Sequence, residues 1–138
     1  RLPEAIAGRP VVNAGIAGAT VDDFNSIALS LLDDHKPSVI VIELGTNNQL
    51  GTIRTGYRSL LQKLRGTSAL LLAVGVTPQD GANEKNAEIK AAAASECIRF
   101  IELNVPAGST FPNDVHLSAS GYAAWRTAII AAVTDLNS

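Results

Sequence analysis

The chain of 138 residues is long enough to bury the hydrophobic core of one domain, and its 46% hydrophobic and 17% charged residues exclude a disordered or fibrous protein. A net charge of −2 gives no support for a nucleic-acid partner, and no apolar run approaches the roughly 20 residues that span a bilayer. The single cysteine, Cys97, cannot form an internal disulfide or a cysteine metal cage. The compartment stays open, because secreted, periplasmic and cytoplasmic proteins all fit.

Four apolar segments predict β-strands, at residues 11–12, 39–44, 69–76 and 98–103. The second and third are nearly continuous hydrophobic runs, which is typical of parallel strands covered on both faces. Glu43 is the exception inside the second run. A buried carboxylate needs a partner, so we expect Glu43 to be structural and close to the rim of a site.

Helical spacing of apolar residues predicts helices over residues 21–31, 53–64 and 122–136, the last with Ser118 as N-cap. The alanine-rich residues 83–96 favour a helix but carry a weak apolar stripe, so we expect that helix on the outside. The alternation of strand and helix predicts one α/β layered sandwich on a parallel sheet. Sites in such sheets form at the carboxyl ends of the strands, here the loops 14–20, 45–50, 77–83 and 104–117.

Two of these loops contain groups that can donate hydrogen bonds to an anion. Gly15 and Gly18 precede a predicted helix, where backbone N–H groups can point into a site. Asn47 and Asn48 follow the second long strand, and a carboxamide fixed there can donate to a developing oxyanion. The alternative for both loops is an ordinary turn, which glycine and asparagine also favour.

The other two loops hold a weaker and a stronger candidate. Thr77 and Gln79 can touch a substrate, although the loop around them is rich in turn residues, and Asn48 and Asn113 are further candidates for substrate contact from the neighbouring loops. His116 lies close to Asp114 and Asn113, and a carboxylate beside a histidine suits a general base because it fixes the tautomer and stabilises the imidazolium. The alternative is a surface histidine beside a helix start.

The blocks NAGIAGAT, VIELGTNN and DVHLSASGY, in this order, resemble the SGNH (GDSL) hydrolases. The resemblance covers essentially the whole chain and implies a flavodoxin-like three-layer sandwich with a parallel sheet. It also implies a Ser–His–Asp triad, a small-molecule ester substrate, and no cofactor or metal. By this resemblance Gly18 and Asn47 are the oxyanion-hole donors and His116 is the catalytic histidine, while Asn48 replaces the usual aspartate.

The catalytic acid departs from the pattern of this family. The position three residues before the histidine, where the family has its acid, is Asn113, and Asp114 stands one residue later. An asparagine would not compensate the imidazolium, and comparable substitutions in serine enzymes cost orders of magnitude in rate. We therefore favour Asp114 as the acid.

The family's nucleophilic serine belongs to a block after a first strand, which should precede Arg1. In a flavodoxin-like order 2-1-3-4-5 that strand is central, and its absence leaves a gap of roughly 10 Å between apolar edges. We therefore expect residues 1–138 to be a single, N-terminally incomplete domain. An N-terminal segment or a second chain would complete the sheet.

Three functions remain open. The first is a serine esterase that hydrolyses a carboxylic ester, such as an acetyl ester, with its serine upstream of residue 1 or on a partner segment. The second is a non-catalytic binding or assembly module that kept the fold. The third is a flavodoxin-like nucleotide or phosphate binder that uses the glycines Gly15 and Gly18.

Overall fold

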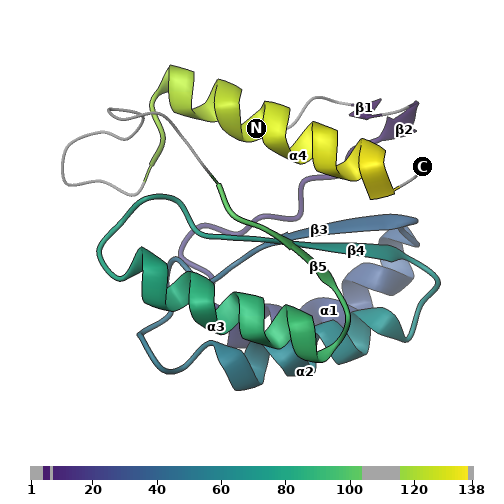
Figure 1. Ribbon diagram of the computed structural model, residues 1–138. Helices are drawn as coiled ribbons and strands as arrows, with labels where there is room; N and C mark the ends of the chain where they lie inside the picture. Colours follow the sequence, from purple (N-terminus) through teal and green to yellow (C-terminus); the bar gives the residue numbers. More distant parts are fainter. Residues whose placement is uncertain (1–4, 7, 104–115, 137–138) are drawn as a thin grey trace.

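The computed structural model describes residues 5–6, 8–103 and 116–136 of the chain. Two short strands open the described part of the chain, and from Arg9 to Leu136 strand and helix alternate (Figure 1). The elements are β1 (Ala5–Ile6), β2 (Arg9–Pro10), α1 (Val21–His35), β3 (Val39–Glu43), α2 (Arg54–Arg65), β4 (Leu70–Val74), α3 (Ala82–Ser95), β5 (Arg99–Ile101) and α4 (Ala119–Leu136). None of the helices in these ranges has the length and apolar character to cross a membrane.

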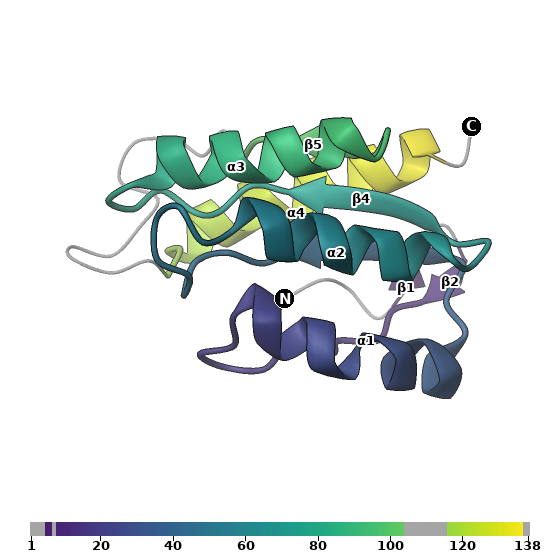
Figure 2. The same cartoon turned by 90° about the horizontal axis from the view of Figure 1, so that it is seen from below.

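The main sheet consists of β3, β4 and β5, all parallel, with β4 in the middle. The register places Val39 opposite Leu70 and Val74 opposite Ile101. Figure 1 and Figure 2 show α1, α2 and α3 on one side of this sheet and α4 on the other. The predicted α/β sandwich on a parallel sheet is therefore confirmed.

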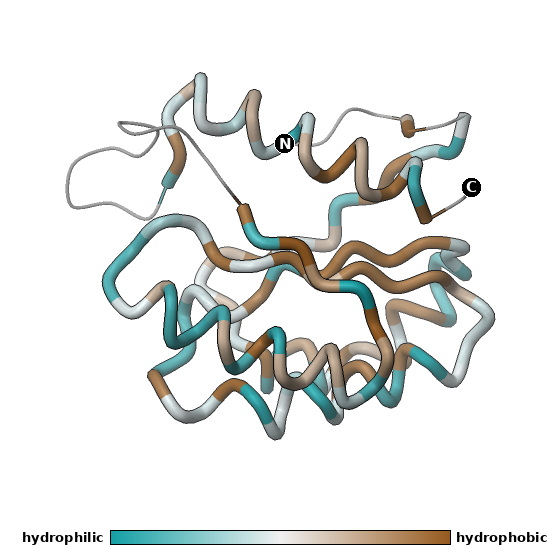
Figure 3. Tube along the Cα trace, viewed as in Figure 1, coloured by the Kyte–Doolittle hydropathy of each residue, from teal (hydrophilic) through white to brown (hydrophobic). Residues whose placement is uncertain are grey.

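Apolar side chains fill both faces of the sheet, as the continuous hydrophobic strands of Figure 3 indicate. On the side of α2 and α3, Tyr57 and Ile89 are fully buried in a cluster that contains Ala73. On the other side, Ile129 of α4 is buried in a cluster with Leu72. Each such side chain stabilises the fold by about 1.5–3 kcal/mol through burial. The two packed faces hold the carboxyl ends of the strands in fixed positions.

The three long apolar runs form strands as predicted, but the strand predicted at residues 11–12 is wrong. Val11 and Val12 lie outside any strand, and the Val12 side chain is 59% exposed. The chain instead turns at Gly8, with φ +77°, and pairs β1 with β2 in an antiparallel ladder. A short apolar segment forms a strand only when a neighbouring strand offers it hydrogen-bond partners. No strand lies at the outer edge of β3 within the described part of the chain, so residues 11–12 have no strand on this side of the sheet to pair with.

The N-cap at Ser118 is confirmed, because its hydroxyl accepts a hydrogen bond from the N–H of Gly121 at 3.3 Å. The outer position predicted for the alanine-rich helix is wrong. α3 buries Lys85, Asn86, Ile89, Ala92 and Ala93. Two of these buried residues, Lys85 and Asn86, are polar, which explains why the sequence of this helix shows only a weak apolar stripe.

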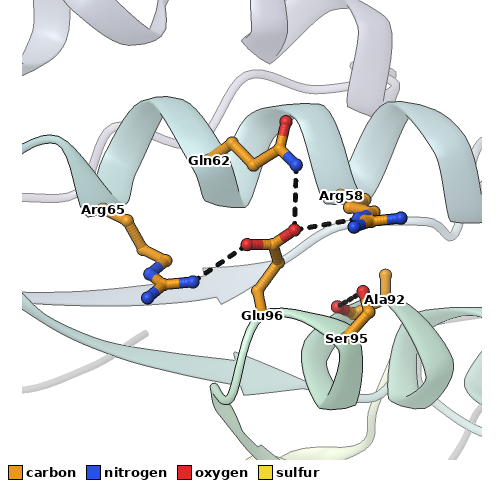
Figure 4. A network of polar contacts seen from close by, with 6 residues as sticks. All are labelled: Arg58, Gln62, Arg65, Ala92, Ser95 and Glu96. Atoms are coloured by element: carbon orange, nitrogen blue, oxygen red, sulfur yellow. Dashed lines mark hydrogen bonds and ion pairs between the residues drawn. The ribbon is translucent and has the colours of Figure 1, made fainter.

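Glu96, the residue after α3, joins this helix to α2 (Figure 4). Its side chain is 8% exposed and accepts hydrogen bonds from Arg58 at 2.8 Å, Gln62 at 2.9 Å and Arg65 at 2.9 Å. Hydrogen bonds from Arg58, then Gln62 and Arg65, hold the pKa of the Glu96 carboxyl below its usual value. The three donors favour the charged form of the carboxylate, because each of them forms a hydrogen bond with it.

Candidate active site

The loop between β2 and α1 ends in a well-defined helix start. Thr20 and Asp23 form a capping box: the N–H of Thr20 donates to Asp23 Oδ2 at 2.8 Å, and the N–H of Asp23 donates to Thr20 Oγ1 at 3.3 Å. Gly18 lies just before this box with φ +75°, a left-handed conformation that favours glycine. Its N–H makes no hydrogen bond within the described ranges, so this donor is available to a ligand.

The loop after β3 turns sharply at Gly45, whose φ of +123° suits only glycine. A Cβ at this position would come within 3.3 Å of Ile89 Cδ1 and 3.4 Å of Val76 Cγ1. The N–H of Asn48 donates to the carbonyl of Gly45 at 3.0 Å and closes the turn. Two residues lie between them, of which Thr46 is half-buried and Asn47 is exposed.

Hydrogen bonds join these two loops directly. Asn47 Nδ2 donates to the carbonyl of Ala19 at 3.1 Å, next to Gly18 in sequence. A carboxamide nitrogen carries two hydrogens, so this bond orients the amide and leaves a second N–H for a ligand. The structure therefore brings together the Asn47 and Gly18 loops, which contain the two predicted oxyanion donors.

Asn48 has a different environment from Asn47. It is 8% exposed, and its Oδ1 accepts a hydrogen bond from the N–H of Val21 at 3.0 Å. Val21 opens α1, where the first N–H groups lack a helical partner. The Asn48 side chain thus satisfies one of these groups and fixes α1 to the end of β3, whereas it was predicted as a residue of the substrate loop.

Thr77 and Gln79, the other predicted substrate-loop residues, lie half-buried after β4. Gln79 Nε2 donates to the carbonyl of Thr77 at 3.1 Å, and Gln79 Oε1 accepts from Lys85 Nζ at 3.1 Å. A cavity of about 520 Å³ opens beside Gln79, between the loop after β4 and the end of β5. Its polar lining includes Asn83, Asn86 and Glu102.

His116 is exposed and lies immediately before α4. The next residue, Leu117, is only 2% exposed, which anchors the chain at this point. Asp114 and Asn113 lie outside the described residues, so the pairing of His116 with either stays a prediction. Ser118 and Ser120, the serines closest to His116 in sequence, have hydroxyl groups 3.1 Å apart and belong to the start of α4.

The loops after β3 and β4 and the starts of α1 and α4 lie at one end of the molecule in Figure 1 and Figure 2. This is the end to which the carboxyl ends of the parallel strands point, as the sequence predicted. A backbone N–H, an oriented carboxamide and a histidine at one rim are the groups that acyl transfer requires around a carbonyl carbon.

Glu43 ends β3 at the same rim. Desolvation raises the pKa of its carboxyl to about 7. Its side chain is nevertheless exposed. Neighbouring protein atoms replace part of the water around the carboxylate and favour its protonated form near neutral pH, whereas the water that remains in contact with it favours the charged form.

A model of the GDSL-like lipase/acylhydrolase family matches residues 1–124. The chain belongs to this family. No curated protein matches the sequence.

Solved structures of GDSL-type hydrolases share the fold at low sequence identity. TesA is 22% identical with a TM-score of 0.79, and the alignment covers 93% of this chain and 79% of TesA. A GDSL-like lipase from Bacteroides thetaiotaomicron is 18% identical with a TM-score of 0.78, over 90% of this chain and 75% of that one. A catalytic mutant of Axe2, an acetylxylan esterase from Geobacillus stearothermophilus, is 18% identical with a TM-score of 0.78, over 90% and 72% of the two chains.

Sequence reasoning missed Lys85 and Glu88, two residues of α3 that bond the loop between β3 and α2 at the candidate site. Lys85 Nζ donates to the carbonyl of Thr46, and Glu88 accepts from the N–H groups of Gly51 and Ile53. A signal was present in their spacing, since Lys85, Glu88, Ile89 and Ala92 follow the i, i+3, i+4, i+7 pattern of one helix face. The charges at two of these positions concealed it.

Proposed function

We propose that this chain is part of an SGNH-type serine esterase that hydrolyses a carboxylic ester with a small acyl group, such as an acetyl ester. The observation that carries the proposal is the hydrogen bond from Asn47 Nδ2 to the Ala19 carbonyl, which sets a carboxamide donor beside the Gly18 loop. Family membership supports ester hydrolysis in general. Axe2, which acts as an acetylxylan esterase, supports the choice of a short acyl group.

The proposed reaction has two halves that use the same residues. A serine Oγ attacks the acyl carbon while His116 takes its proton, and the Gly18 N–H and Asn47 Nδ2 stabilise the negative oxygen that forms. His116 then gives the proton to the departing alcohol and leaves an acyl-serine. Water repeats the sequence and releases the carboxylic acid. Asp114 orients His116 and stabilises its charged form.

The serine in this proposal comes from a segment outside residues 1–138, carried by a strand that pairs with the outer edge of β3. β3 is the edge strand of the described sheet. Apart from Glu43, its residues are apolar, from Val39 to Ile42, and none of these four is exposed. An apolar edge with unpaired backbone groups readily accepts another strand.

The test is hydrolysis of p-nitrophenyl acetate by the full-length protein and its His116→Ala variant. We expect His116→Ala to lower kcat/KM by at least on the order of 10³-fold, because the imidazole is the group proposed to carry the proton. His35→Ala is the matched control, since His35 lies exposed at the end of α1 and should leave the rate unchanged. If the full-length protein contains a Gly-Asp-Ser block and His116→Ala keeps full activity, the proposed role is wrong.

The second candidate is a non-catalytic binding or assembly module with the same fold. Asn113 at the family's usual acid position favours it, as does the outer edge of β3, which can bind another chain without any catalysis. The coding sequence upstream of Arg1 distinguishes the two: a strand followed by Gly-Asp-Ser supports the esterase, and a strand without a serine supports the module.

A further inference from the structure

We infer that Lys85 and Glu88 of α3 form a clamp that presets the loop carrying Asn47, so that Lys85 is a positioning residue for the oxyanion donor. The inference rests on the proposed function, because it concerns the same site. The name "α3 clamp" is used below for Lys85 and Glu88 together. Neither residue belongs to the family motifs identified in the sequence.

Lys85 supplies one half of the α3 clamp. It is a buried cation, 8% exposed, in the first turns of a helix, where the positive end of the helix dipole disfavours a further positive charge. Its ammonium group donates to the carbonyl of Thr46 at 2.8 Å and to Gln79 Oε1 at 3.1 Å. The Thr46 carbonyl belongs to the peptide bond that joins Thr46 to Asn47. Lys85 therefore fixes the orientation of the peptide that precedes the oxyanion donor.

Glu88, one turn further along α3, supplies the other half. Its carboxylate accepts from the N–H groups of Gly51 at 2.9 Å, Ile53 at 3.0 Å and Arg54 at 3.3 Å. Desolvation raises the pKa of the Glu88 carboxyl, but the three backbone hydrogen bonds outweigh it and keep this pKa below its usual value. The N-cap residue of α2, Ile53, makes no side-chain capping bond, so Glu88 serves as the cap from a neighbouring helix.

One helix thus holds both ends of the Asn47 loop. Lys85 binds the loop where it leaves β3, and Glu88 binds it where it enters α2. Between them, Ile89 packs where a side chain on Gly45 would otherwise lie. Catalytic donors work best when they are held in place before the charge develops, because no energy is then lost in reorganising them.

Stability alone is a weak reason for a lysine at this position. Burying an ammonium group carries a desolvation penalty, and an apolar side chain of similar length would fill the space without it. Positioning explains the lysine better, because its ammonium group holds the peptide carbonyl next to Asn47, the proposed oxyanion donor. Lys85→Met is therefore the informative substitution, since methionine keeps an unbranched side chain out to Cε and removes the ammonium group with its charge and donors.

The test measures kcat and KM of the full-length protein on p-nitrophenyl acetate. We expect Lys85→Met to lower kcat on the order of tenfold, the fold-change that corresponds to one charged hydrogen bond, with KM within about twofold. Lys90→Met, an exposed position on the same helix, is the matched control and should match the parent enzyme. In the Asn47→Ala background, Lys85→Met should cause no further loss of kcat, because the donor it positions is gone. An equal loss in both backgrounds overturns the inference.

Hydrogen exchange supplies a readout that does not need activity. Lys85→Met and Glu88→Gln should speed exchange in residues 45–53 while leaving β4 and α4 unchanged. Unchanged exchange at 45–53 overturns the clamp even in an active enzyme. Absence of esterase activity in the parent protein overturns the proposed function and the catalytic part of the inference, and the exchange data then decide the clamp by themselves.

Discussion

Two adjacent asparagines in the same turn illustrate how burial divides chemical roles. Asn47 is exposed and uses one N–H to hold itself against the Ala19 carbonyl, while Asn48 is buried and satisfies the first N–H of α1. Their side chains are chemically identical, so the difference lies only in the direction that the Gly45 turn gives each one. The proposed function uses the exposed amide of Asn47, whereas the buried amide of Asn48 holds the start of α1.

Substitution of each asparagine by alanine should separate these roles. Asn47→Ala should lower kcat by about 10²–10³-fold, the usual effect of removing one oxyanion donor, with the free energy of unfolding changed by less than about 1 kcal/mol. Asn48→Ala should instead lower the free energy of unfolding by about 1–3 kcal/mol, because it leaves a buried N–H unsatisfied. Urea denaturation and steady-state kinetics on both variants test this contrast. A stable, fully active Asn47→Ala enzyme would contradict the assignment.

At the level of helices and strands, the sequence was most informative where the apolar pattern was undiluted. The runs at 39–44 and 69–76 became β3 and β4, and the clear stripe of α2 became a buried face with Tyr57 and Leu61. Gly18, Asn47 and His116 could be proposed as site residues because short motifs carry them, and their catalytic roles stay predictions. The position of α3 was predicted wrongly because a charged residue lies at each end of its inner face. These residues are Lys85 in the helix and Glu96 just after it, and both are buried. Apolar periodicity cannot detect a face whose polar groups are paired inside the fold.

The Glu96 cluster makes the docking of α3 on α2 dependent on pH. The folded pKa of Glu96 lies below its unfolded value, so the unfolded state binds the proton more readily. The stabilisation is therefore present above the unfolded pKa and is lost as pH falls through the folded pKa. We expect Glu96→Gln to lower the thermal midpoint at pH 7, and the difference from the parent protein to shrink as the pH is lowered below about 4.3, the usual pKa of glutamate.

Scanning calorimetry of the two proteins between pH 7 and pH 3 checks this expectation. Glu102→Gln is a suitable control, since Glu102 is an exposed carboxylate at the end of β5 that makes a long hydrogen bond of 3.4 Å to Asn86. A constant difference between Glu96→Gln and the parent protein across this range would exclude the charged cluster as the cause.

At the scale of the whole molecule, the two faces of the sheet are packed by different sets of contacts. α1, α2 and α3 are joined to each other and to the sheet by the Glu96 cluster, the α3 clamp and the larger apolar cluster. α4 covers the opposite face of the sheet in Figure 1, with β1 and β2 beside its C-terminal half. It packs there through a smaller cluster in which Ile129, Ala132 and Val133 are buried, and its Asp135 forms an ion pair with Arg99 of β5.

We expect the two halves of the candidate site to differ in local stability. The proposed oxyanion half is built from residues only 27 and 28 positions apart in the chain, whose bonds form between the start of α1 and the end of β3. The histidine half stands before α4, a helix that we expect to open without disturbing those bonds. Partial opening of α4 would remove His116 while Gly18 and Asn47 keep their arrangement.

Mild denaturant should therefore inactivate the enzyme before it unfolds. We expect esterase activity to disappear at a lower urea concentration than the main loss of far-ultraviolet circular dichroism, with exchange of α4 amides accelerating alongside the loss of activity. Coincident transitions would instead mean that α4 opens only with the whole domain. If α4 opens first, the time for which the protein stays active under stress depends on the packing of this one helix against the sheet. Substitutions that strengthen this packing alone should then lengthen that time.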